Sequence, residues 1–377
     1  MLTGKRFLIY AQGGYSDRLR AVPFLRALWK SNHGGSVNML GYEPSRELWE
    51  MCPYVDGFIS MGPGPILGRD RKSNLRKAAL ATRTGIARRG CHDVFLNLSV
   101  MPEGLFPGLL SVVAGIPLRV GHGGPRQGVN RSAGPSDLRV PYETRATQLL
   151  SLIGVAMTDF SLEAWCSDED RAEVARLLAE PFWTGARIVV CHPNSDWSCQ
   201  MWPAQRWAEV IEAIWKRHRC RIVLTGLAEE RAFIDEILSR LSVPVTDLTG
   251  RTSHSRLCAL LELADAVVTL DTLVAPLARA MGTEVVTLMS TDTPNWSPQR
   301  LIELGSLGFE VDATSPPAWS VLCKWRRTGV VERCQSGSCV GVHGMGRIRP
   351  DAVLDRVAHC LAADRPAMAS TGGPELR

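Results

Sequence analysis

Two side chains that could bind a polar ligand, Asp271 and Thr272, stand directly after an apolar run with the pattern of a β-strand. That run is AVVTL (266–270), and the residues after the pair have helical spacing before a second strand-like run, EVVTLM. This order puts a carboxylate, a hydroxyl and the N–H groups of a helix start at the carboxyl edge of a parallel sheet. Ligands bind at this edge in open α/β sheets, and helix starts favour phosphate. The segment therefore predicts a phosphate site.

A Gly-rich turn follows the first strand-like run of the chain, RFLIY, and carries Gly13, Gly14, Asp17 and Arg18. Its spacing differs from the GxGxxG fingerprint with which dinucleotide-binding folds approach a pyrophosphate. A dinucleotide oxidoreductase is therefore disfavoured. An aspartate at the start of a helix most often caps it, and it also stays ionised there, as a general base must.

Four soft metal ligands gather within 21 residues near the C-terminus: Cys323, Cys334, Cys339 and His343. Such a set can hold zinc or iron in tetrahedral geometry, and a metal there would be structural. The spacing contains no CxxC pair, so free thiols in a loop are the alternative. Other cysteines stand singly in apolar runs, as Cys191, Cys220 and Cys258 do, and are expected to be buried.

The elements that must position these residues alternate between short apolar runs and stretches of helical spacing, which predicts mostly parallel α/β sheets. In the first half the expected strands are 6–10, 36–40, 56–61, 93–100 and 118–122. In the second half they are 187–192, 221–226, 243–250, 266–271 and 284–290. Residues 123–137, rich in Gly, Pro and Ser, are expected to form a loop, and Pro23 is expected to kink the first helix. Trp202 and Trp207 are expected in the core.

The chain of 377 residues is long enough for two domains, and its 45% hydrophobic and 21% charged residues are ordinary for a globular protein. No apolar run reaches the roughly eighteen residues of a membrane span. The N-terminal run also lacks the long apolar region of a signal peptide. We therefore expect a cytoplasmic protein.

The net charge of +5 is concentrated in one segment. Residues 68–90 contain eight Arg or Lys and one Asp, a local charge of +7, so the remainder carries 5 − 7 = −2. A basic patch favours an anionic partner or an anionic membrane surface, and a solvated helix is the alternative interpretation. Nucleic acid is not an expected partner.

Four stretches, read in order, resemble the ADP-heptose:lipopolysaccharide heptosyltransferases, glycosyltransferase family 9. They are LIYAQGGYSDRLRAVPFLRALWK, RIVVCHPNSDWSCQMWPAQRWAEV, DLTGRTSHSRLCALLELADAVVTLDTLVAPLARAMGTEVVTLM and the Cys-containing segment before the final helix. The likeness spans about residues 5–362. No single motif decides it, whereas the ordered set at matching intervals is fairly specific.

The resemblance implies an α/β protein of the GT-B fold, with two Rossmann-like domains facing across a cleft. The acceptor would bind in the N-terminal half and the nucleotide-sugar donor in the C-terminal half. The predicted limits are 1–165 (acceptor domain), 166–185 (inter-domain linker), 186–349 (donor domain), 350–363 (C-terminal helix) and 364–377 (disordered tail). The two candidate sites then fall in different domains.

On the acceptor side, the resemblance implies that Asp17 is the catalytic base. It would take the proton of the acceptor hydroxyl as that oxygen attacks the anomeric carbon of the donor sugar. Gly13, Gly14 and Arg18 would lie beside it on the acceptor side.

Transfer by this class of fold is expected to need no cofactor. Some family members that modify autotransporter proteins are similar in carrying an iron-binding cysteine finger.

On the donor side, Asp271 and Thr272 match the family's phosphate loop, where the growing charge of the leaving diphosphate must be stabilised. Ser195 matches a hydroxyl that contacts phosphate. Glu229 and Glu230 match an acidic position that meets the ribose or the adenine. Exposed acids at a helix start are the alternative for these two glutamates.

The chain departs from the family pattern at three donor positions: Gln200 in place of a lysine, Leu273 in place of a glycine and Pro276 in place of a histidine. Gln200 keeps an N–H donor but loses the positive charge, for which Arg206 or Arg251 could substitute. Leu273 forbids an easy positive φ, and Pro276 removes a donor. The departures predict an altered donor pose, a different donor or an inactive site.

The leading hypothesis is an inverting, metal-independent glycosyltransferase that moves a heptose or a related sugar from an ADP-sugar. The acceptor hydroxyl would belong to lipopolysaccharide core, to a protein or to a metabolite, and the protein would work in the cytoplasm or at the inner face of the membrane. One alternative is a non-catalytic protein that binds nucleotides or glycans. A nucleotide-sugar epimerase, which shares the fold, is the other.

Overall fold

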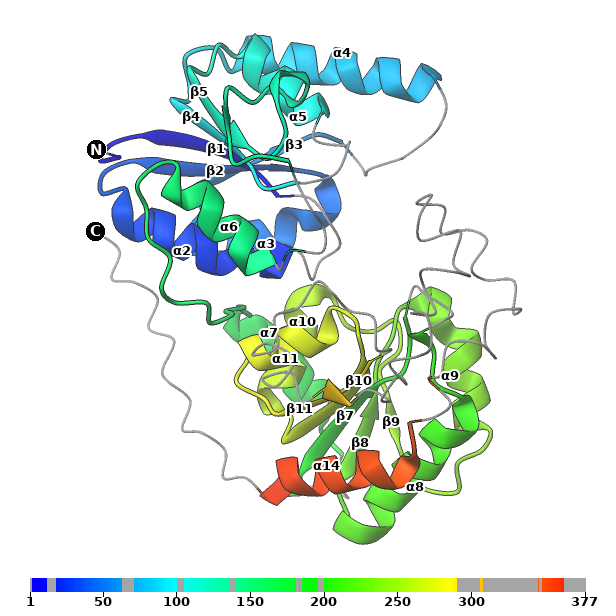
Figure 1. Ribbon diagram of the computed structural model, residues 1–377. Helices are drawn as coiled ribbons and strands as arrows, with labels where there is room; N and C mark the ends of the chain where they lie inside the picture. The colour runs from blue at the N-terminus through cyan, green and yellow to red at the C-terminus, as the bar shows by residue number, and fades with distance from the viewer. Residues whose placement is uncertain are drawn as a thin grey trace, which may run out of the picture. The chain divides into compact units, whose positions relative to one another are not determined.

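The computed structural model describes residues 2–11, 18–62, 71–99, 105–135, 140, 142–180, 183, 185–195, 200–289, 306–307, 345 and 348–362. These residues divide into two compact units, unit 1 up to Ala164 and unit 2 from Trp165. Each unit is built on one sheet with helices packed against it (Figure 1).

The sheet of unit 1 consists of β1 (Arg6–Tyr10), β2 (Ser36–Gly41), β3 (Gly57–Ser60), β4 (Val94–Asn97), β5 (Leu118–Gly121) and β6 (Arg131–Ser132). Every neighbouring pair is parallel, and the order is β3-β2-β1-β4-β5-β6. This is the strand order of the Rossmann fold. The inner strands read as continuous apolar runs, such as FLIY in β1, because helices cover both faces of the sheet.

The sheet of unit 2 consists of β7 (Ile188–His192), β8 (Arg221–Leu224), β9 (Thr246–Asp247), β10 (Ala266–Leu270), β11 (Val285–Leu288) and β12 (Ser306–Leu307). It too is parallel, in the order β12-β11-β10-β7-β8-β9. Numbered from β7, this is the same Rossmann order. Both units therefore have a switch point, between β1 and β4 and between β7 and β10, where ligands commonly bind.

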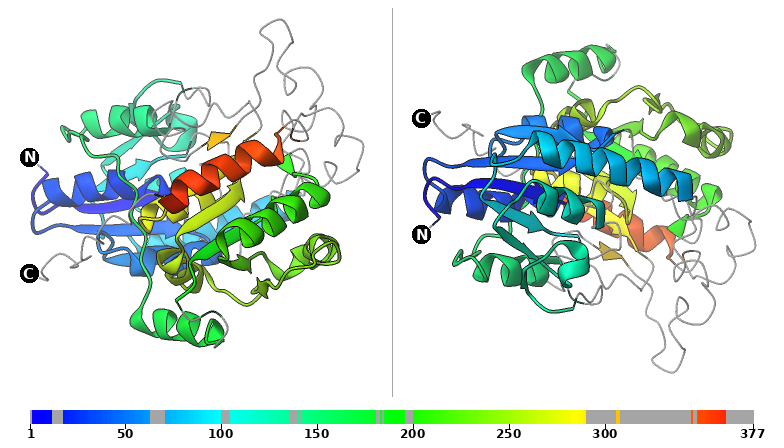
Figure 2. Two further views of the ribbon diagram at one scale, coloured as in Figure 1. Left: turned by 90° about the horizontal axis from the view of Figure 1, so that it is seen from below. Right: turned by 90° about the horizontal axis from the view of Figure 1, so that it is seen from above.

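The helices of unit 1 are α2 (Val22–Ser31), η1 (Glu43–Ser45), α3 (Arg46–Met51), α4 (Arg71–Ala87), α5 (Leu105–Val113), η3 (Pro125–Gln127) and α6 (Tyr142–Ser151). Those of unit 2 are α7 (Asp168–Leu177), α8 (Ala204–His218), η6 (Ala228–Glu230), α9 (Arg231–Leu238), α10 (His254–Leu263), α11 (Val274–Ala280) and α14 (Pro350–Ala362). In unit 1, α4 and α5 cover one face of the sheet, and α2, α3 and α6 cover the other (Figure 1). In unit 2, α14 packs against α8, as the view from below in Figure 2 shows, and α7 packs against α10.

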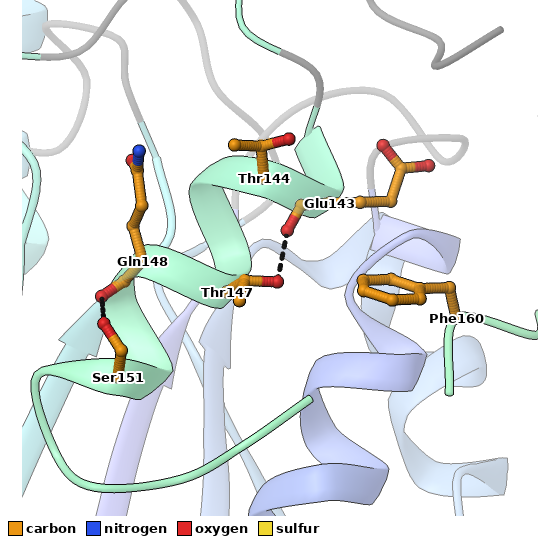
Figure 3. Close-up of a pocket in the computed structure, with 6 residues that line it drawn as sticks. All are labelled: Glu143, Thr144, Thr147, Gln148, Ser151 and Phe160. Atoms are coloured by element: carbon orange, nitrogen blue, oxygen red, sulfur yellow. Dashed lines mark hydrogen bonds between the residues drawn. The ribbon is translucent and has the colours of Figure 1, made fainter. Parts of the chain in front are cut away.

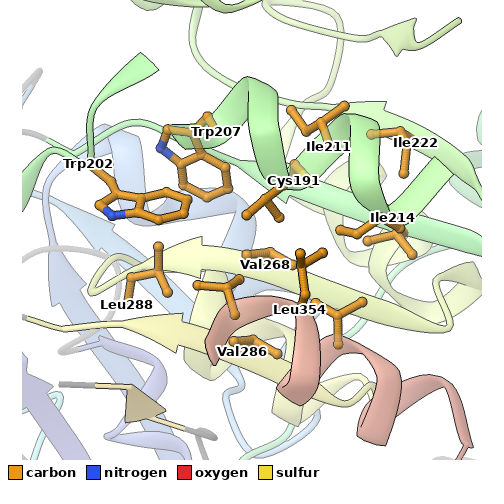
Figure 4. Close-up of a cluster of buried hydrophobic side chains, with 14 of the residues drawn as sticks. Cys191, Trp202, Trp207, Ile211, Ile214, Ile222, Val268, Val286, Leu288 and Leu354 are labelled. Atoms are coloured by element: carbon orange, nitrogen blue, oxygen red, sulfur yellow. The ribbon is translucent and has the colours of Figure 1, made fainter. Parts of the chain in front are cut away.

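The core of unit 2 is built around two tryptophans (Figure 4). Trp202 and Trp207 are fully buried and meet edge to face, with their ring centroids 5.3 Å apart. The indole of Trp202 donates to the Ile348 carbonyl at 3.2 Å, which ties the segment before α14 to this core. The expected core role of both tryptophans is confirmed. The expected burial of the cysteines in apolar runs is confirmed as well for Cys191, Cys220 and Cys258.

The helical stretch around Pro23 is interrupted, as expected. Residues 18 and 19 are helical, a turn follows at 20–21, and α2 then begins at Val22 with Pro23 in its first turn. A backbone N–H has no intrahelical acceptor in a first turn, so proline is tolerated there. One other local expectation in unit 1 is wrong. The expected loop at 123–137 contains η3 and the short strand β6, whose Ser132 pairs with Gly121 of β5.

The segment 166–185, which the sequence marked as a linker, contains α7. Ser167 caps this helix by accepting from the Asp170 amide at 3.1 Å. Arg171 of α7 binds Glu262 of α10 with Nε 2.7 Å from Oε2. Since Glu262 is largely buried, this pair attaches α7 firmly to unit 2.

Candidate functional site

A row of polar side chains crosses three strands of unit 2 at the carboxyl edge of the sheet. Thr269, at the end of β10, lies 3.3 Å from Thr272 (Oγ1 to Oγ1), and its hydroxyl donates to the His192 carbonyl at 3.3 Å. Nδ1 of His192, the last residue of β7, lies 3.1 Å from Oγ1 of Thr225, which follows β8. The row brings Thr272 to the switch point between β7 and β10, where the sequence placed the phosphate site.

The turn after β10 is regular despite its unusual residues. Leu273 has φ −53° and ψ −35°, which is right-handed helical backbone, so no positive φ is needed at this position. The expected conflict between Leu273 and the backbone is therefore absent. The Thr272 hydroxyl accepts from the Val274 amide at 3.3 Å and so holds the start of α11. Pro276 lies in the first turn of this seven-residue helix, where it removes one of the unpaired N–H groups.

A second group of polar residues surrounds Gly226 at the ends of β7, β8 and β9. A Cβ added at Gly226 would lie 2.9 Å from Glu230 Oε2, 3.5 Å from Asn194 Nδ2 and 3.6 Å from Thr249 Cγ2. The Gly250 amide donates to the Gly226 carbonyl at 2.8 Å. This bond links the loop after β9 to the loop after β8. We call Asn194, Gly226, Glu230 and Thr249 the Gly226 cluster. A larger residue here would crowd the Glu230 carboxylate, so glycine lets these polar groups approach the backbone closely.

Two polar atoms of the Gly226 cluster are buried without a partner. Asn194 Nδ2 and Thr249 Oγ1 make no hydrogen bond to the protein in the part of the chain that the structure describes. A buried polar group left unpaired costs about 1–3 kcal/mol, so a polar ligand that satisfied both would bind favourably. Neither residue was predicted from the sequence. Each stands two positions after a strand that ends at this edge, but the sequence does not show that its polar group is buried without a partner.

Ser195 and Gln200 are joined by a hydrogen bond. The Ser195 hydroxyl donates to Gln200 Oε1 at 2.8 Å, and Gln200 is only 4% exposed. A hydroxyl has a single proton, so in this geometry Ser195 cannot also donate to a phosphate oxygen. Turning the Gln200 amide over would present Nε2 to Ser195 and release that proton. Gln200 thus positions Ser195, where a lysine would have supplied charge.

The two glutamates expected near the ribose differ in role. Glu230 accepts from the Leu227 amide at 2.7 Å with Oε2, the same atom that faces Gly226. It therefore fixes the loop after β8 while lying within the Gly226 cluster. Glu229 is exposed one position earlier. The two interpretations offered by the sequence, a helix-start acid and a ligand-facing acid, are both compatible with the position of Glu230.

Arg206 and Arg251 were predicted as substitutes for the positive charge that Gln200 lacks. Arg206 donates to the Ile348 carbonyl at 2.7 Å and so contacts the backbone before α14. Arg251 is exposed and directly follows Gly250, which is bonded to Gly226. Burial lowers the pKa of His192 to about 4, so its imidazole is neutral at pH 7. Arg251 is therefore the better candidate to face an anionic ligand here.

Several predicted residues lie outside the described part of the chain: Gly13, Gly14, Asp17, Cys323, Cys334, Cys339 and His343. Arg18 is described and its side chain is buried. Within the described ranges, no three His, Cys, Asp or Glu side chains are grouped so that they could hold a metal ion. No helix in these ranges is long and apolar enough to span a membrane.

A small hollow of about 320 Å³ lies in unit 1, on the side of α6 that carries Glu143, Thr144, Thr147, Gln148 and Ser151 (Figure 3). Phe160 closes it from the chain segment after α6. Two of its hydroxyls are satisfied within the helix, because Thr147 donates to the Glu143 carbonyl and Ser151 to the Gln148 carbonyl. The hollow belongs to unit 1, whereas the predicted donor residues all lie in unit 2.

Two parallel sheets of Rossmann order, each in its own unit, define the fold as GT-B, as predicted. The family model of glycosyltransferase family 9 (heptosyltransferase) matches residues 136–300, a range that includes every predicted donor-side residue. The predicted resemblance to this family is thus confirmed over the matched range. No curated protein sequence matches the chain.

Three solved structures illustrate the similarity of fold. The glycosyl transferase family 9 protein from Veillonella parvula DSM 2008 is 16% identical with a TM-score of 0.73, over 96% of this chain and 98% of that chain. E. coli ADP-heptose LPS heptosyltransferase II is 17% identical with a TM-score of 0.69, over 94% and 98%. The iron-containing dodecameric glycosyltransferase TibC from enterotoxigenic E. coli H10407 is 14% identical with a TM-score of 0.53, over 95% and 77%. At these identities the likeness concerns the fold.

Proposed function

We propose that the chain is an inverting glycosyltransferase that moves a heptose or a related sugar from an ADP-sugar to an acceptor hydroxyl. The observation that carries the proposal is the Gly226 cluster. It holds two buried polar groups without protein partners, at the sheet edge where Rossmann domains bind nucleotides. The cluster lies within the range matched by the family model. An ADP-sugar is favoured because a solved structure of the same fold is an ADP-heptose transferase.

In the proposed reaction the acceptor oxygen attacks the anomeric carbon of the donor. A new carbon–oxygen bond forms while the bond from that carbon to the diphosphate breaks, and the nucleoside diphosphate leaves with the electron pair. Asp17 takes the proton of the acceptor hydroxyl, with Gly13, Gly14 and Arg18 beside it. The scheme assigns no step to a metal or another cofactor.

The donor would be held by groups from several strand ends. Asn194 and Thr249 would hydrogen-bond the nucleotide through the groups that the protein leaves unpaired. Glu229 and Glu230 would face the ribose or adenine. Ser195, Asp271 and Thr272 would lie at the diphosphate and the sugar, and Gln200 would set the direction of the Ser195 hydroxyl. Arg251 would supply positive charge to the diphosphate.

The acceptor is proposed to be an anionic glycolipid such as lipopolysaccharide core, or a hydroxyl of a protein or metabolite. The basic segment 68–90 supports an anionic acceptor, because it adds a local charge of +7 to the half that would hold the acceptor. The protein would act in the cytoplasm, at the inner face of the membrane when the acceptor is a lipid.

A donor panel tests the proposed function. We expect ADP-sugars to raise the melting temperature, whereas GDP- and UDP-sugars leave it unchanged, because binding to the folded state alone stabilises it. Asn194→Ala should reduce the ADP-sugar shift, because one polar contact of about 1.5 kcal/mol weakens binding about tenfold, while leaving the melting temperature of the free protein nearly unchanged. A clear shift with a UDP- or GDP-sugar and none with ADP-sugars would refute the donor assignment. Conversion of an ADP-sugar without any acceptor would indicate an epimerase.

A structural zinc or iron ion at Cys323, Cys334, Cys339 and His343 is also proposed. The proposal is supported by the ligand types and by the iron-containing glycosyltransferase of similar fold. We expect purified protein to contain about one metal ion per chain and Cys334→Ser to lose it, whereas Cys91→Ser should retain it because Cys91 stands alone on the surface. Mass spectrometry of each purified variant measures the number of metal ions bound per chain. Equal metal in both variants would contradict the proposed site.

A further inference from the structure

An apolar stripe runs along the outer side of α5. Leu105, Leu109 and Val112 are spaced four and three residues apart, which places them on one face of the helix. They are 43%, 37% and 47% exposed, and Ile86 of the neighbouring helix α4 is 55% exposed. Single exposed apolar residues are common, but several on adjoining helices form a surface that favours a partner.

Helices α4 and α5 lie side by side on the same face of the unit 1 sheet, as the view from above in Figure 2 shows. Their contact is close at Gly85, where an added Cβ would lie 2.8 Å from the Leu110 carbonyl oxygen and 2.9 Å from Val113 Cβ. Further along, Lys77 Nζ lies 6.0 Å from the centre of the Phe106 ring. The apolar stripe of α5 is therefore bordered along its length by α4.

The side chains that α4 adds to this surface are basic. Residues 76–92 contain five Arg or Lys and no acidic residue. Arg76 and Arg83 are exposed on the flank of α4 that faces away from Gly85 and α5, so they form the far edge of the surface. Arg88 and Arg89 are exposed just beyond the end of α4, and Arg89 Nε donates to the Val113 carbonyl of α5 at 3.2 Å. The α4/α5 surface is defined by Arg76, Lys77, Arg83, Ile86, Arg88, Arg89, Leu105, Leu109 and Val112. It combines an apolar stripe with a positive border.

We propose that the α4/α5 surface binds an anionic lipid bilayer. The apolar side chains would enter the boundary between headgroups and acyl chains, and the arginines would face lipid phosphates, which is how peripheral basic and amphipathic surfaces bind membranes. A second copy of the chain is a poor occupant, because its equally basic surface would repel the first. This binding adds a partner to the proposed glycosyltransferase and is measured without donor or transfer, so either proposal can fail alone.

The test is co-sedimentation of the full chain with vesicles of phosphatidylcholine alone or with about 30% phosphatidylglycerol. We expect binding only to the anionic vesicles, and weaker binding at high salt. Arg76→Ser/Arg83→Ser should lower the partition coefficient about 25-fold, since each basic residue near an anionic surface contributes about fivefold. The matched control is Arg217→Ser/Arg356→Ser, which removes the same charge from exposed positions of unit 2 and should bind like the parent protein.

A separate variant tests how much the apolar side chains of the α4/α5 surface contribute to vesicle binding. Leu109→Ser/Val112→Ser should lower the partition coefficient roughly tenfold and leave the melting temperature unchanged, because both side chains are exposed in the free protein. Equal binding to neutral vesicles, no binding at all, or an equal loss in the control would overturn the proposal. Unchanged binding of the apolar variant would overturn it too. A parent dimer that this variant dissociates would make the surface a self-interface instead.

Discussion

The two units share one strand order but carry different chemistry. In unit 2 the polar side chains gather at the carboxyl edge of the sheet, in the row from Thr272 to Thr225 and in the Gly226 cluster. In unit 1 the described residues concentrate charge and exposed apolar area on the outer helices, on the α4/α5 surface. Topology therefore locates an edge where a ligand can bind, whereas the residues after each strand decide what binds there.

The largest effect should come from Asp17, the proposed acceptor-side base, which would give a catalytic role to the N-terminal half of the chain. We expect Asp17→Ala to lower the rate of sugar transfer by about 10²–10⁴-fold, the usual contribution of a general base. Affinity for the ADP-sugar should stay the same, because the donor groups are in unit 2. Transfer rates and donor titrations measure the two separately. Unimpaired transfer would remove Asp17 from the mechanism, and a matching loss of donor affinity would move it to the donor site.

The next effect concerns the donor edge of unit 2. Gly226→Val should weaken ADP-sugar binding roughly a hundredfold, because the new side chain fills the space between Asn194 and Thr249 and two polar contacts of about 1.5 kcal/mol each are lost. Calorimetric titration measures the change.

The matched control for that variant is Gly124→Val in unit 1. Gly124 has extended backbone, and no atom lies within 4 Å of an added Cβ. It should therefore bind the donor like the parent protein. If Gly226→Val also binds normally, the nucleotide does not enter the Gly226 cluster, and the row beside Thr272 becomes the better place to look for it.

The sequence was sufficient for much of the fold because buried parallel strands are continuous apolar runs. The five strands expected in each half are present, with ends that differ by a few residues. The two strands that it did not predict, β6 and β12, have two residues each. Strands this short leave no periodic pattern, since they depend on pairing with a neighbour that is remote in sequence.

Candidate site residues could be predicted where a motif follows a strand, but not where burial decides which polar groups lack a partner. Asp271 and Thr272 were predicted because they follow an obvious strand, and Thr272 lies at the expected sheet edge. Asn194 and Thr249 stand out only once the fold buries them without partners. The restraint expected at Leu273 was misjudged, because the residue type does not reveal whether the backbone there needs a positive φ.

Acid should destabilise both units by the same mechanism. Burial lowers the pKa of His92 in unit 1 and of His192 in unit 2 to about 4. An unfolded histidine has a pKa near 6.5, so the unfolded state takes up the proton first as the pH falls. The free energy of unfolding should be highest above pH 6.5 and fall between 6.5 and 4. Each histidine should contribute about 2 kcal/mol of loss between pH 7 and pH 5.

Chemical denaturation at pH 7 and at pH 5 measures this expected loss in the free energy of unfolding. His92→Gln and His192→Gln should each remove about 2 kcal/mol of the difference between pH 7 and pH 5. If the units unfold in separate steps, each variant should flatten the pH dependence of its own unit. A pH dependence that neither substitution alters would mean that other groups control the acid stability.

The smallest effect tests whether unit 2 supplies its own positive charge in place of the missing lysine. Arg251→Gln should weaken ADP-sugar binding about fivefold, because an exposed charge facing a diphosphate contributes about 1 kcal/mol in water. The remaining affinity should depend less on salt, since one screened charge has been removed. Arg217→Gln, an exposed arginine on α8, is the matched control and should change neither quantity. An unchanged affinity in Arg251→Gln, together with an unchanged salt dependence, would show that the donor phosphates meet no charge from this loop. The altered residue at position 200 would then reflect recognition of the donor by hydrogen bonds alone, through Ser195, Thr272 and the Gly226 cluster.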